Sequence, residues 1–179
     1  MITIQNRRRK IENIEKAFPN AEIIDVTSKG SGRFVKFSPF YPIGGIPIPN
    51  SEEAISESVE GIWQGLKVFS NEDIDLSKFQ ITNMKGLKRT VRKYGTPLGH
   101  RYGINGTELL DYISARKKIY VPVYHWVLEN KLGTEVEELK SIHSRKDIVL
   151  LDYETNEDLE NDSKPLSHAS LIKKFILNS

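Results

Sequence analysis

Apolar residues recur along the chain at two spacings, which predict helices joined by a few short strands. Helical spacing is found over residues 5–17, 53–69, 84–95, 107–112, 114–131, 134–144 and from about 165 to the end. Strand-like apolar runs cover residues 21–28, 33–38 and 147–153. Helical segments therefore outnumber strands, and the pattern predicts an α+β fold that is mainly α with a small β component.

The start of the chain predicts a helix followed by a hairpin. The runs 21–28 and 33–38 are separated by Lys-Gly-Ser-Gly, a typical turn sequence. Together with the helix over 5–17 they would form an N-terminal unit, residues 5–38, packed on a helical body. The length of 179 residues suits one domain, so we expect a single domain over residues 1–179.

Composition excludes several classes of site. The chain has no cysteine, which excludes disulfides, thiolate metal sites and cysteine nucleophiles. The four histidines are scattered, so we expect no metal and no cofactor. No apolar run approaches the ~18 residues of a membrane span, and the first ten residues lack the apolar stretch of a signal peptide. The expected location is the cytoplasm, without a membrane partner.

The stretch SVEGIWQGLKVF, residues 58–69, predicts a helix with almost no solvent face. Its broad apolar arc consists of Val59, Ile62, Trp63, Leu66 and Phe69. The glycines at 61 and 65 suggest that another segment packs closely on the far side. The only charges, Glu60 and Lys67, share one narrow strip with Gln64 at i, i+4 and i+7.

Two interpretations of this strip stay open, because an unpaired buried charge costs several kcal/mol. In the first, Glu60 forms a structural ion pair with Lys67 or with an arginine. In the second, the strip is the wall of a cleft in which a carboxylate and an amine face a ligand. A desolvated lysine has a lowered pKa and can act as a base or form an imine, and a neighbouring glutamate can move protons.

The pattern "FSPFYP" followed by "SVEGIWQGLKVF" resembles the NADAR domain, the family of YbiA-like N-glycosidases. The corresponding residues are Phe40, Tyr41 and Pro42, then Ser58, Val59, Glu60, Gln64 and Lys67. The similarity is good over about 38–69, and beyond that range only the order of elements matches. "DYETNED" and "KPLSHAS" replace the family's tryptophan-glycine and asparagine-leucine-glycine segments, and Trp63 stands where the family often has tyrosine. The chain is thus similar to a divergent member.

The resemblance implies a mostly helical, YbiA-like single domain. It also implies cleavage of N-glycosidic bonds in ribosylated small molecules, or removal of ADP-ribose from modified bases. Glu60 and Lys67 would be catalytic. Substrate-binding roles would fall to Phe40, Tyr41, Trp63 and Gln64.

A basic segment offers a candidate phosphate site. The predicted helix over 84–95 would carry Lys85, Lys88, Arg89 and Arg92 on one face. No acid relieves their repulsion, which favours a phosphate or nucleic-acid partner over the alternative, an ordinary solvated face. His100 and Arg101 follow in a loop between glycines and join the substrate-binding candidates, although His100 also suits a loop hydrogen bond.

A second acid comes from the strand-like run over 147–153. Asp152 lies near its end, where it is a candidate catalytic carboxylate, and N-capping or an ion pair is an equal alternative.

The sequence therefore predicts an N-glycoside hydrolase acting on a ribosylated small molecule, a nucleotide or an ADP-ribose adduct. Its ligand would be a phosphorylated riboside or an ADP-ribose-like molecule. One alternative is a non-catalytic ADP-ribose-binding or nucleotide-binding protein. Another is a nucleic-acid-binding module, with a single-stranded partner. The oligomeric state is left open.

Overall fold

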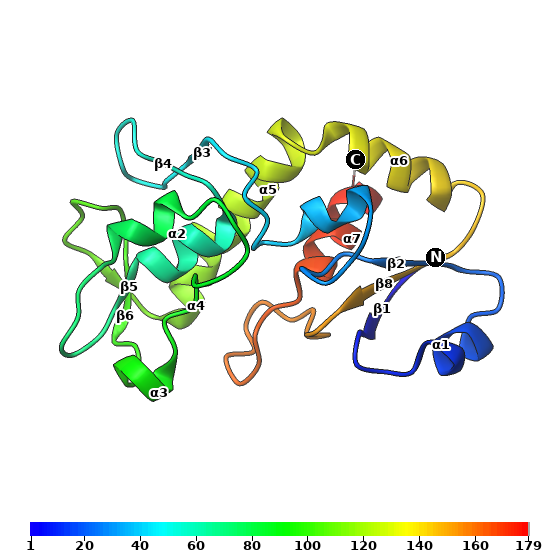
Figure 1. Ribbon diagram of the computed structural model, residues 1–179, viewed down its shortest axis with the longest axis horizontal. Coiled ribbons are helices and arrows are strands. Elements are labelled where there is room, and N and C mark those ends of the chain that lie inside the picture. Colours follow the sequence, from blue (N-terminus) through cyan, green and yellow to red (C-terminus); the bar gives the residue numbers. More distant parts are fainter. Residues whose placement is uncertain (179) are drawn as a thin grey trace. The chain divides into compact units, whose positions relative to one another are not determined.

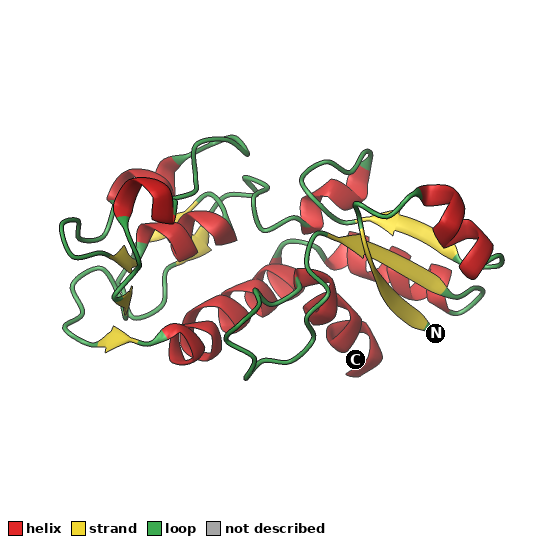
Figure 2. Ribbon diagram, turned by 90° about the horizontal axis from the view of Figure 1, so that it is seen from below, coloured by secondary structure: helices red, strands yellow, loops and turns green. Residues whose placement is uncertain are grey.

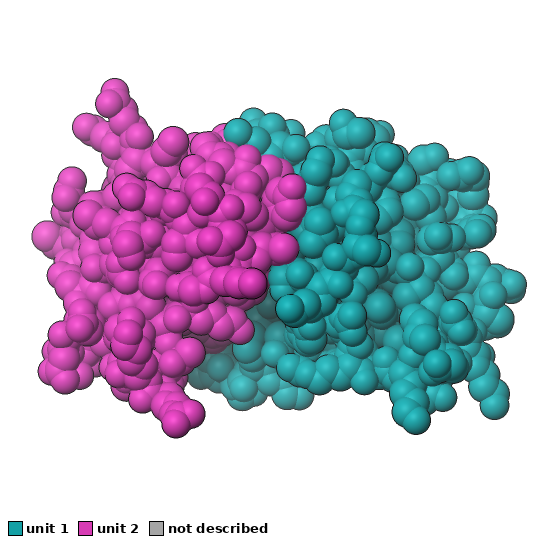
Figure 3. All heavy atoms as spheres, in the orientation of Figure 1, with its two compact units in different colours: residues 1–38, 128–179 teal, residues 39–127 magenta. Residues whose placement is uncertain are grey.

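The computed structural model describes residues 1–178, which divide into two compact units (Figure 3). Unit 1 contains residues 1–38 and the chain from Leu128 onward, and unit 2 contains Pro39–Val127. Helices predominate, and the strands form small sheets, which confirms the predicted α+β class. The single domain predicted for residues 1–179 stays a prediction.

Unit 1 is built on a parallel sheet in the order β1-β8-β2 (Figures 1 and 2). Its strands are β1 (Ile2–Asn6), β8 (Ile148–Asp152) and β2 (Glu22–Asp25). All five residues of the central strand β8 are buried, as an uninterrupted apolar run predicts for a strand with neighbours on both edges. The strand predicted over 147–153 is confirmed.

Three α-helices and one 3₁₀-helix complete what is described of unit 1. They are α1 (Ile11–Ala17), η1 (Arg33–Phe37), α6 (Gly133–His143) and α7 (His168–Asn178). Helix α1 connects β1 to β2, and α7 packs against β1 and β8. Ile14 of α1 joins Val149 and Leu151 of β8 in a buried cluster. The predicted helices near 134–144 and after 165 are confirmed.

The predicted N-terminal helix and hairpin are wrong in two places. Residues 2–6 are a strand and the helix begins only at Ile11. Residues 33–37 are a 3₁₀-helix, and β2 pairs in parallel with β8, with Glu22 opposite Ile148. The reason is that β8, more than 120 residues away in sequence, supplies the hydrogen bonds that both β1 and β2 need.

Unit 2 holds two small antiparallel sheets. In the first, β3 (Ile46–Pro47) pairs with β4 (Ile55–Ser56). In the second, β6 (Gly99–Arg101) lies between β5 (Lys67–Val68) and β7 (Leu109–Leu110). The helix predicted over 107–112 is therefore wrong, because that segment supplies an edge strand.

The helices of unit 2 are short. They are α2 (Val59–Gly65), η2 (Leu76–Gln80), α3 (Val91–Tyr94), α4 (Tyr112–Ala115), η3 (Arg116–Tyr120) and α5 (Val121–Asn130), of which α5 runs on into unit 1 from Leu128. The last three are continuous and correspond to the helix predicted over 114–131. Within this helix η3 is a turn of π-helix, and Pro122 is the second residue of α5.

Helix α2 is shorter than the predicted 53–69 but packs as its glycines indicate. The Ser58 hydroxyl accepts a hydrogen bond from the Gly61 N–H and caps the helix. A Cβ at Gly65 would lie 2.3 Å from Cε1 of Phe79, and one at Gly61 would lie 2.7 Å from the carbonyl oxygen of Lys78. The close approach of another segment, here η2, is confirmed.

The predicted helix over 84–95 is wrong except at its end. Only Val91–Tyr94 are helical. Before them, buried Leu87 and Arg89 alternate with exposed Lys88 and Thr90, which is the period of extended chain. The basic residues at 85, 88, 89 and 92 therefore do not share one helical face.

Candidate functional site

The polar strip of residues 60, 64 and 67 forms a chain of hydrogen bonds. Gln64 Nε2 donates to Glu60 Oε1 at 2.7 Å, and Lys67 Nζ donates to Gln64 Oε1 at 3.1 Å. Glu60 and Gln64 are 7% and 5% exposed, whereas Lys67 is only partly buried. Gln64 thus links the two charged residues of the strip.

The backbone of Arg89 determines which way the Gln64 amide faces. Its N–H donates to Gln64 Oε1 at 2.9 Å, and a backbone N–H can only donate, so the atom that it meets is the amide oxygen. The amide nitrogen must then face Glu60. The Oε1 atom of Glu60 therefore acts as an acceptor, which suits an ionised carboxylate.

The buried side chain of Arg89 contacts the backbone and two aromatic rings close to the polar strip. Its guanidinium donates to the carbonyl oxygens of Lys67 at 2.6 Å and Asp73 at 2.7 Å. Its Cζ atom lies 4.7 Å from the ring centroid of Phe69 and 5.1 Å from that of Tyr94. Arg89 is only 3% exposed. Its guanidinium therefore does not face solvent, as the predicted phosphate contact would require.

The pKa of Lys67 lies below its usual range. Burial is the largest cause, since desolvation disfavours the ammonium form. The Glu60 carboxylate acts in the opposite direction, and the positive charges of Arg89 and Lys88 lower the pKa further. The Lys67 amine is therefore both a stronger proton donor when charged and more often neutral than an exposed lysine.

Aromatic rings surround Trp63 on the same stretch of α2. The His100 ring centroid lies 3.8 Å from that of Trp63, and those of Tyr120 and Tyr112 lie 5.5 and 5.9 Å away. The strand register places His100 opposite Lys67. The structure therefore brings two more predicted residues, Trp63 and His100, next to the polar strip.

The "FYP" segment reaches α2 through its backbone. The Glu60 N–H donates to the carbonyl oxygen of Pro39 at 2.8 Å. Phe40 and Tyr41 follow directly and are partly buried. The ammonium of Lys88 lies 5.4 Å from the ring centroid of Phe40. The segments that carry the resemblance, 39–42 and 60–67, are thus neighbours.

Three basic residues that were predicted to bind the substrate are not part of the hydrogen-bonded chain of residues 60, 64 and 67. Lys85 and Arg92 are exposed. Arg101 donates to Asp73 Oδ1 at 2.6 Å and to the Gly106 carbonyl oxygen at 3.1 Å, which ties two loops together. No continuous basic face joins these residues to Arg89, because Arg89 is buried.

Asp152 belongs to unit 1 and lies in a buried network. Its Oδ2 accepts from Ser167 Oγ at 2.7 Å and from the Ala169 N–H at 3.3 Å, and it lies 3.0 Å from His168 Nδ1. Burial alone would raise the pKa of Asp152, but the charge and hydrogen bond of His168, with the other donors, lower it to about 2. This geometry fits the ion-pair alternative, so we assign Asp152 a structural role and no part in the candidate site of unit 2.

Sequence reasoning missed two buried residues. Arg116 is 1% exposed, and its Cζ atom lies 4.6 Å from the ring centroid of Tyr112. His168 is 7% exposed, and its Nε2 lies 2.9 Å from the Val26 carbonyl oxygen. The i, i+4 spacing of residues 112 and 116 was a usable signal for the first, whereas nothing local marked the second.

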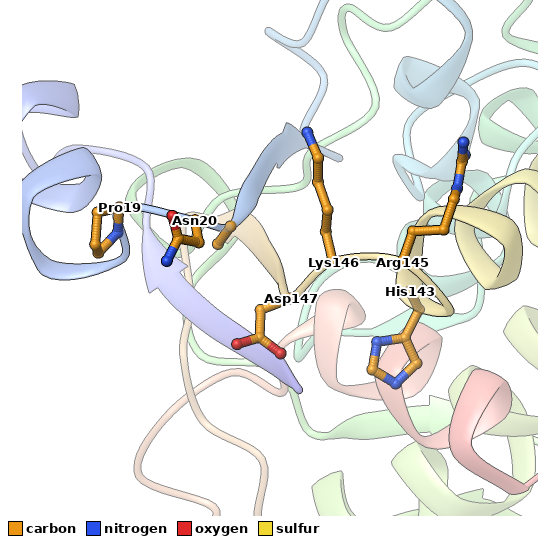
Figure 4. A pocket seen from close by; sticks show the side chains of 7 residues that line it. Pro19, Asn20, His143, Arg145, Lys146 and Asp147 are labelled. Atoms are coloured by element: carbon orange, nitrogen blue, oxygen red, sulfur yellow. The ribbon is translucent and has the colours of Figure 1, made fainter.

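A hollow of about 680 Å³ lies in unit 1, and its lining contains none of the site residues predicted from the sequence (Figure 4). Its lining consists of Pro19, Asn20, Ala21, His143, Arg145, Lys146 and Asp147. In Figure 4 the side chains of Arg145 and Lys146 point one way, and those of His143 and Asp147 point the other. They do not converge on a common point, so the hollow is not a candidate site.

Membrane spans and metal clusters are both absent from the described part of the chain. No helix within residues 1–178 is long and apolar enough to cross a bilayer. Over the same residues, no group of three or more histidine, aspartate or glutamate side chains gathers in a way that could hold a metal ion.

Comparison with protein families gives a match over most of the chain. No curated protein matches the chain. A family model described as "Family of unknown function (DUF6939)" matches residues 6–172, a range that includes the polar strip on α2 and the Asp152 network. Because this match covers most of the chain, the protein belongs to the DUF6939 family, whose function is not known.

Proposed function

We propose that the protein is an N-glycoside hydrolase acting on a ribosylated small molecule, a nucleotide or an ADP-ribose adduct. The observation that carries the proposal is the hydrogen-bonded chain from Glu60 through Gln64 to Lys67, in which Lys67 has a lowered pKa. The resemblance of residues 38–69 to the NADAR domain supports the same reaction. A carboxylate and an amine about two helical turns apart in sequence suit a bond whose cleavage needs one proton removed and one supplied.

The chemistry assigns one role to each residue. Water attacks the anomeric carbon of the ribosyl group, and Glu60 takes a proton from that water. The departing nitrogen of a purine or pyrimidine takes a proton from Lys67, which leaves free sugar and free base, whereas the pyridinium nitrogen of a nicotinamide leaves as the neutral base and takes no proton. Glu60 and Lys67 then exchange protons with solvent to restore the starting state. A carboxylate also stabilises the oxocarbenium-like transition state of glycoside cleavage.

A neutral lysine amine permits a second route, in which Lys67 forms an imine with the aldehyde form of the sugar. Borohydride reduction during turnover distinguishes the two routes. A reduced adduct found by mass spectrometry at Lys67 would establish the imine. Lys67→Arg adds a second readout, because arginine keeps the charge but neither forms an imine nor gives up a proton, so activity retained in this variant would exclude both routes and indicate that Lys67 acts through its charge alone.

Gln64 orients the carboxylate in either route. Its oxygen is held by the Arg89 N–H and by Lys67, and this leaves its N–H group directed at Glu60. Gln64→Glu would place a second acceptor there and remove the donor to Glu60. We expect this variant to lose turnover although its volume is unchanged.

The test measures base release from a panel of ribosides by chromatography. The panel contains nicotinamide mononucleotide, NAD, adenosine monophosphate and uridine monophosphate. Glu60→Gln keeps the shape of the side chain and should lower turnover by roughly 10²-fold or more. Glu52→Gln, at an exposed position, is the matched control and should behave as the wild type.

The outcomes separate the alternatives. Turnover that is unchanged by Glu60→Gln would refute the mechanism. Wild-type protein that binds ADP-ribose or ribose 5-phosphate without cleaving any riboside would be a nucleotide-binding protein. Affinity for single-stranded nucleic acid that falls steeply with salt and survives loss of Glu60 would indicate a nucleic-acid-binding module, although burial of Arg89 weakens that reading. The cytoplasmic location expected from the sequence is part of the proposal.

A further inference from the structure

The ring of Trp63 is held from several directions yet keeps some contact with solvent. His100 lies against it at 3.8 Å between ring centroids, with 32° between the planes. Tyr112 and Tyr120 meet it at 64° and 70°, as edge contacts. Trp63 itself is only partly buried. Such a ring has a fixed orientation, because its neighbours restrict both of its side-chain torsions.

His100 is an unusual neighbour for this ring. It is 2% exposed, and within residues 1–178 neither ring nitrogen has a hydrogen-bond partner of normal geometry. Burial, followed by the charge of Lys67, lowers the pKa of His100 to about 3, against a smaller opposite effect of the Trp63 backbone. The imidazole is therefore neutral at any working pH. Buried nitrogens without partners lower stability, so packing alone does not explain a histidine here.

The position of Trp63 connects the rings to the reacting groups. Trp63 lies three residues after Glu60 on α2, so these two side chains are neighbours on the helix, and Lys67 follows four residues later as the first residue of β5. His100 is also the strand partner of Lys67. A flat group stacked on Trp63 would present its edge to the carboxylate and the amine.

We propose that Trp63, held by His100 and the two tyrosines, is the stacking platform for the flat nitrogen heterocycle of the substrate. This inference rests on the proposed function and names the substrate class, in which the group leaving from the ribosyl carbon is a purine-type or pyrimidine-type ring. Aromatic side chains bind such rings through their π-faces, and this contact tolerates differences between bases. The neutral His100 keeps the platform unchanged between acidic and basic conditions.

The test compares the chain's two tryptophans, which both lie partly buried in unit 2. Binding of free adenine, uracil and nicotinamide is measured by calorimetry for wild type, Trp63→Leu and Trp126→Leu. Trp63→Leu should weaken binding about 10-fold or more, as expected for loss of one stacked ring. Trp126→Leu should bind as the wild type does. Equal affinity in all three proteins, or no binding of any base by the wild type, overturns the proposal.

Fluorescence provides a second measurement that does not depend on the stability of the Trp63 variant. In Trp126→Phe, Trp63 is the only tryptophan that remains. Saturable quenching by a free base, but not by ribose 5-phosphate, supports the platform, and quenching that stays linear with concentration overturns it. His100 should add no pH dependence to the base affinity between about pH 5 and 9, because its pKa of about 3 lies below that range.

Failure of this inference and failure of the proposed function give different results. Free bases bind without any bond being broken, so base binding with no turnover of any riboside keeps the platform and refutes the hydrolase. Turnover with no base binding, and with an unchanged rate in Trp63→Leu, keeps the hydrolase and refutes the platform.

Discussion

Replacing Asp152 with asparagine should destabilise unit 1 and change the response of its stability to pH. His168 Nδ1 faces the Asp152 carboxylate at 3.0 Å, and Nε2 faces the Val26 carbonyl oxygen at 2.9 Å. Both partners are acceptors, so both ring nitrogens must carry protons and the ring is an imidazolium. Burial disfavours that charge, but the Asp152 carboxylate outweighs it and raises the pKa of His168, with smaller help from Val26 and Asp25.

The magnitude follows from the carboxylate. A pKa of about 2 in place of 3.8 corresponds to about 2 kcal/mol of folding free energy at neutral pH. The asparagine side chain would also leave the buried imidazole without its anion, and breaking a buried pair typically costs about 3–5 kcal/mol. We therefore expect Asp152→Asn to lower the free energy of unfolding by about 3 kcal/mol at pH 7.

The sign of each pH effect follows from the direction of the pKa change. The pKa of Asp152 is lowered, so its contribution is complete above 3.8 and is lost as the pH falls toward 2. The pKa of His168 is raised, so its contribution is complete below 6.5 and is lost as the pH rises through the raised value. Wild-type stability should therefore decline on both sides of a plateau, and Asp152→Asn should lack the part of the acid decline that comes from the Asp152 carboxylate.

Guanidinium unfolding followed by circular dichroism from pH 2 to 9 measures these effects. Asp162→Asn, at an exposed aspartate, is the control and should reproduce the wild-type curve. The reasoning is refuted if Asp152→Asn has wild-type stability at pH 7. It is equally refuted if the variant and wild-type curves run parallel between pH 5 and 2.

Three further predictions concern unit 2. Gly65→Ala should cost about 1–3 kcal/mol in thermal unfolding, because its Cβ would lie 2.3 Å from the Phe79 ring, whereas Gly133→Ala in unit 1 should cost nothing, since its Cβ meets no atom within 4 Å. Arg89→Lys should lower the free energy of unfolding by about 1–3 kcal/mol, because the hydrogen bonds to the Lys67 and Asp73 carbonyl oxygens are lost. A stability equal to that of the exposed control Arg92→Lys would contradict this. In labelling with a limiting amount of an amine-reactive reagent, followed by mass spectrometry, Lys67 should react at lower pH than exposed Lys117, because the pKa of Lys67 is lowered. Identical pH profiles for the two lysines would disprove this.

Local sequence patterns were sufficient to predict those helices and strands whose apolar residues follow one regular spacing. The segments that became α6, β8 and α7 were predicted within a few residues, because their apolar spacing needs no particular partner to be recognised. The same reasoning selected Glu60, Gln64 and Lys67, since residues spaced by three or four lie on one side of a helix. It also anticipated a close neighbour at Gly65, because a missing side chain leaves room for one.

Distant partners explain the elements that were mispredicted. Residues 2–6 are a strand because β8 lies beside them, and β2 pairs with β8 in place of residues 33–37, which form a 3₁₀-helix. The basic segment before α3 is extended because Gln64 and the carbonyl oxygens of Lys67 and Asp73 take up the bonding groups of Arg89. No pattern within the segment contains that information.

The amino-acid order thus determined the α+β class and selected a carboxylate and an amide on one side of a short helix, with an amine in the strand that follows. Only the tertiary structure decided which of the charged residues are buried and what each of them contacts. It turned Arg89 inward, set His100 against Trp63, and paired Asp152 with His168. The physical reason is that periodicity records how neighbours along the chain share a surface. Burial and pKa, in contrast, depend on groups that folding brings from far along the chain.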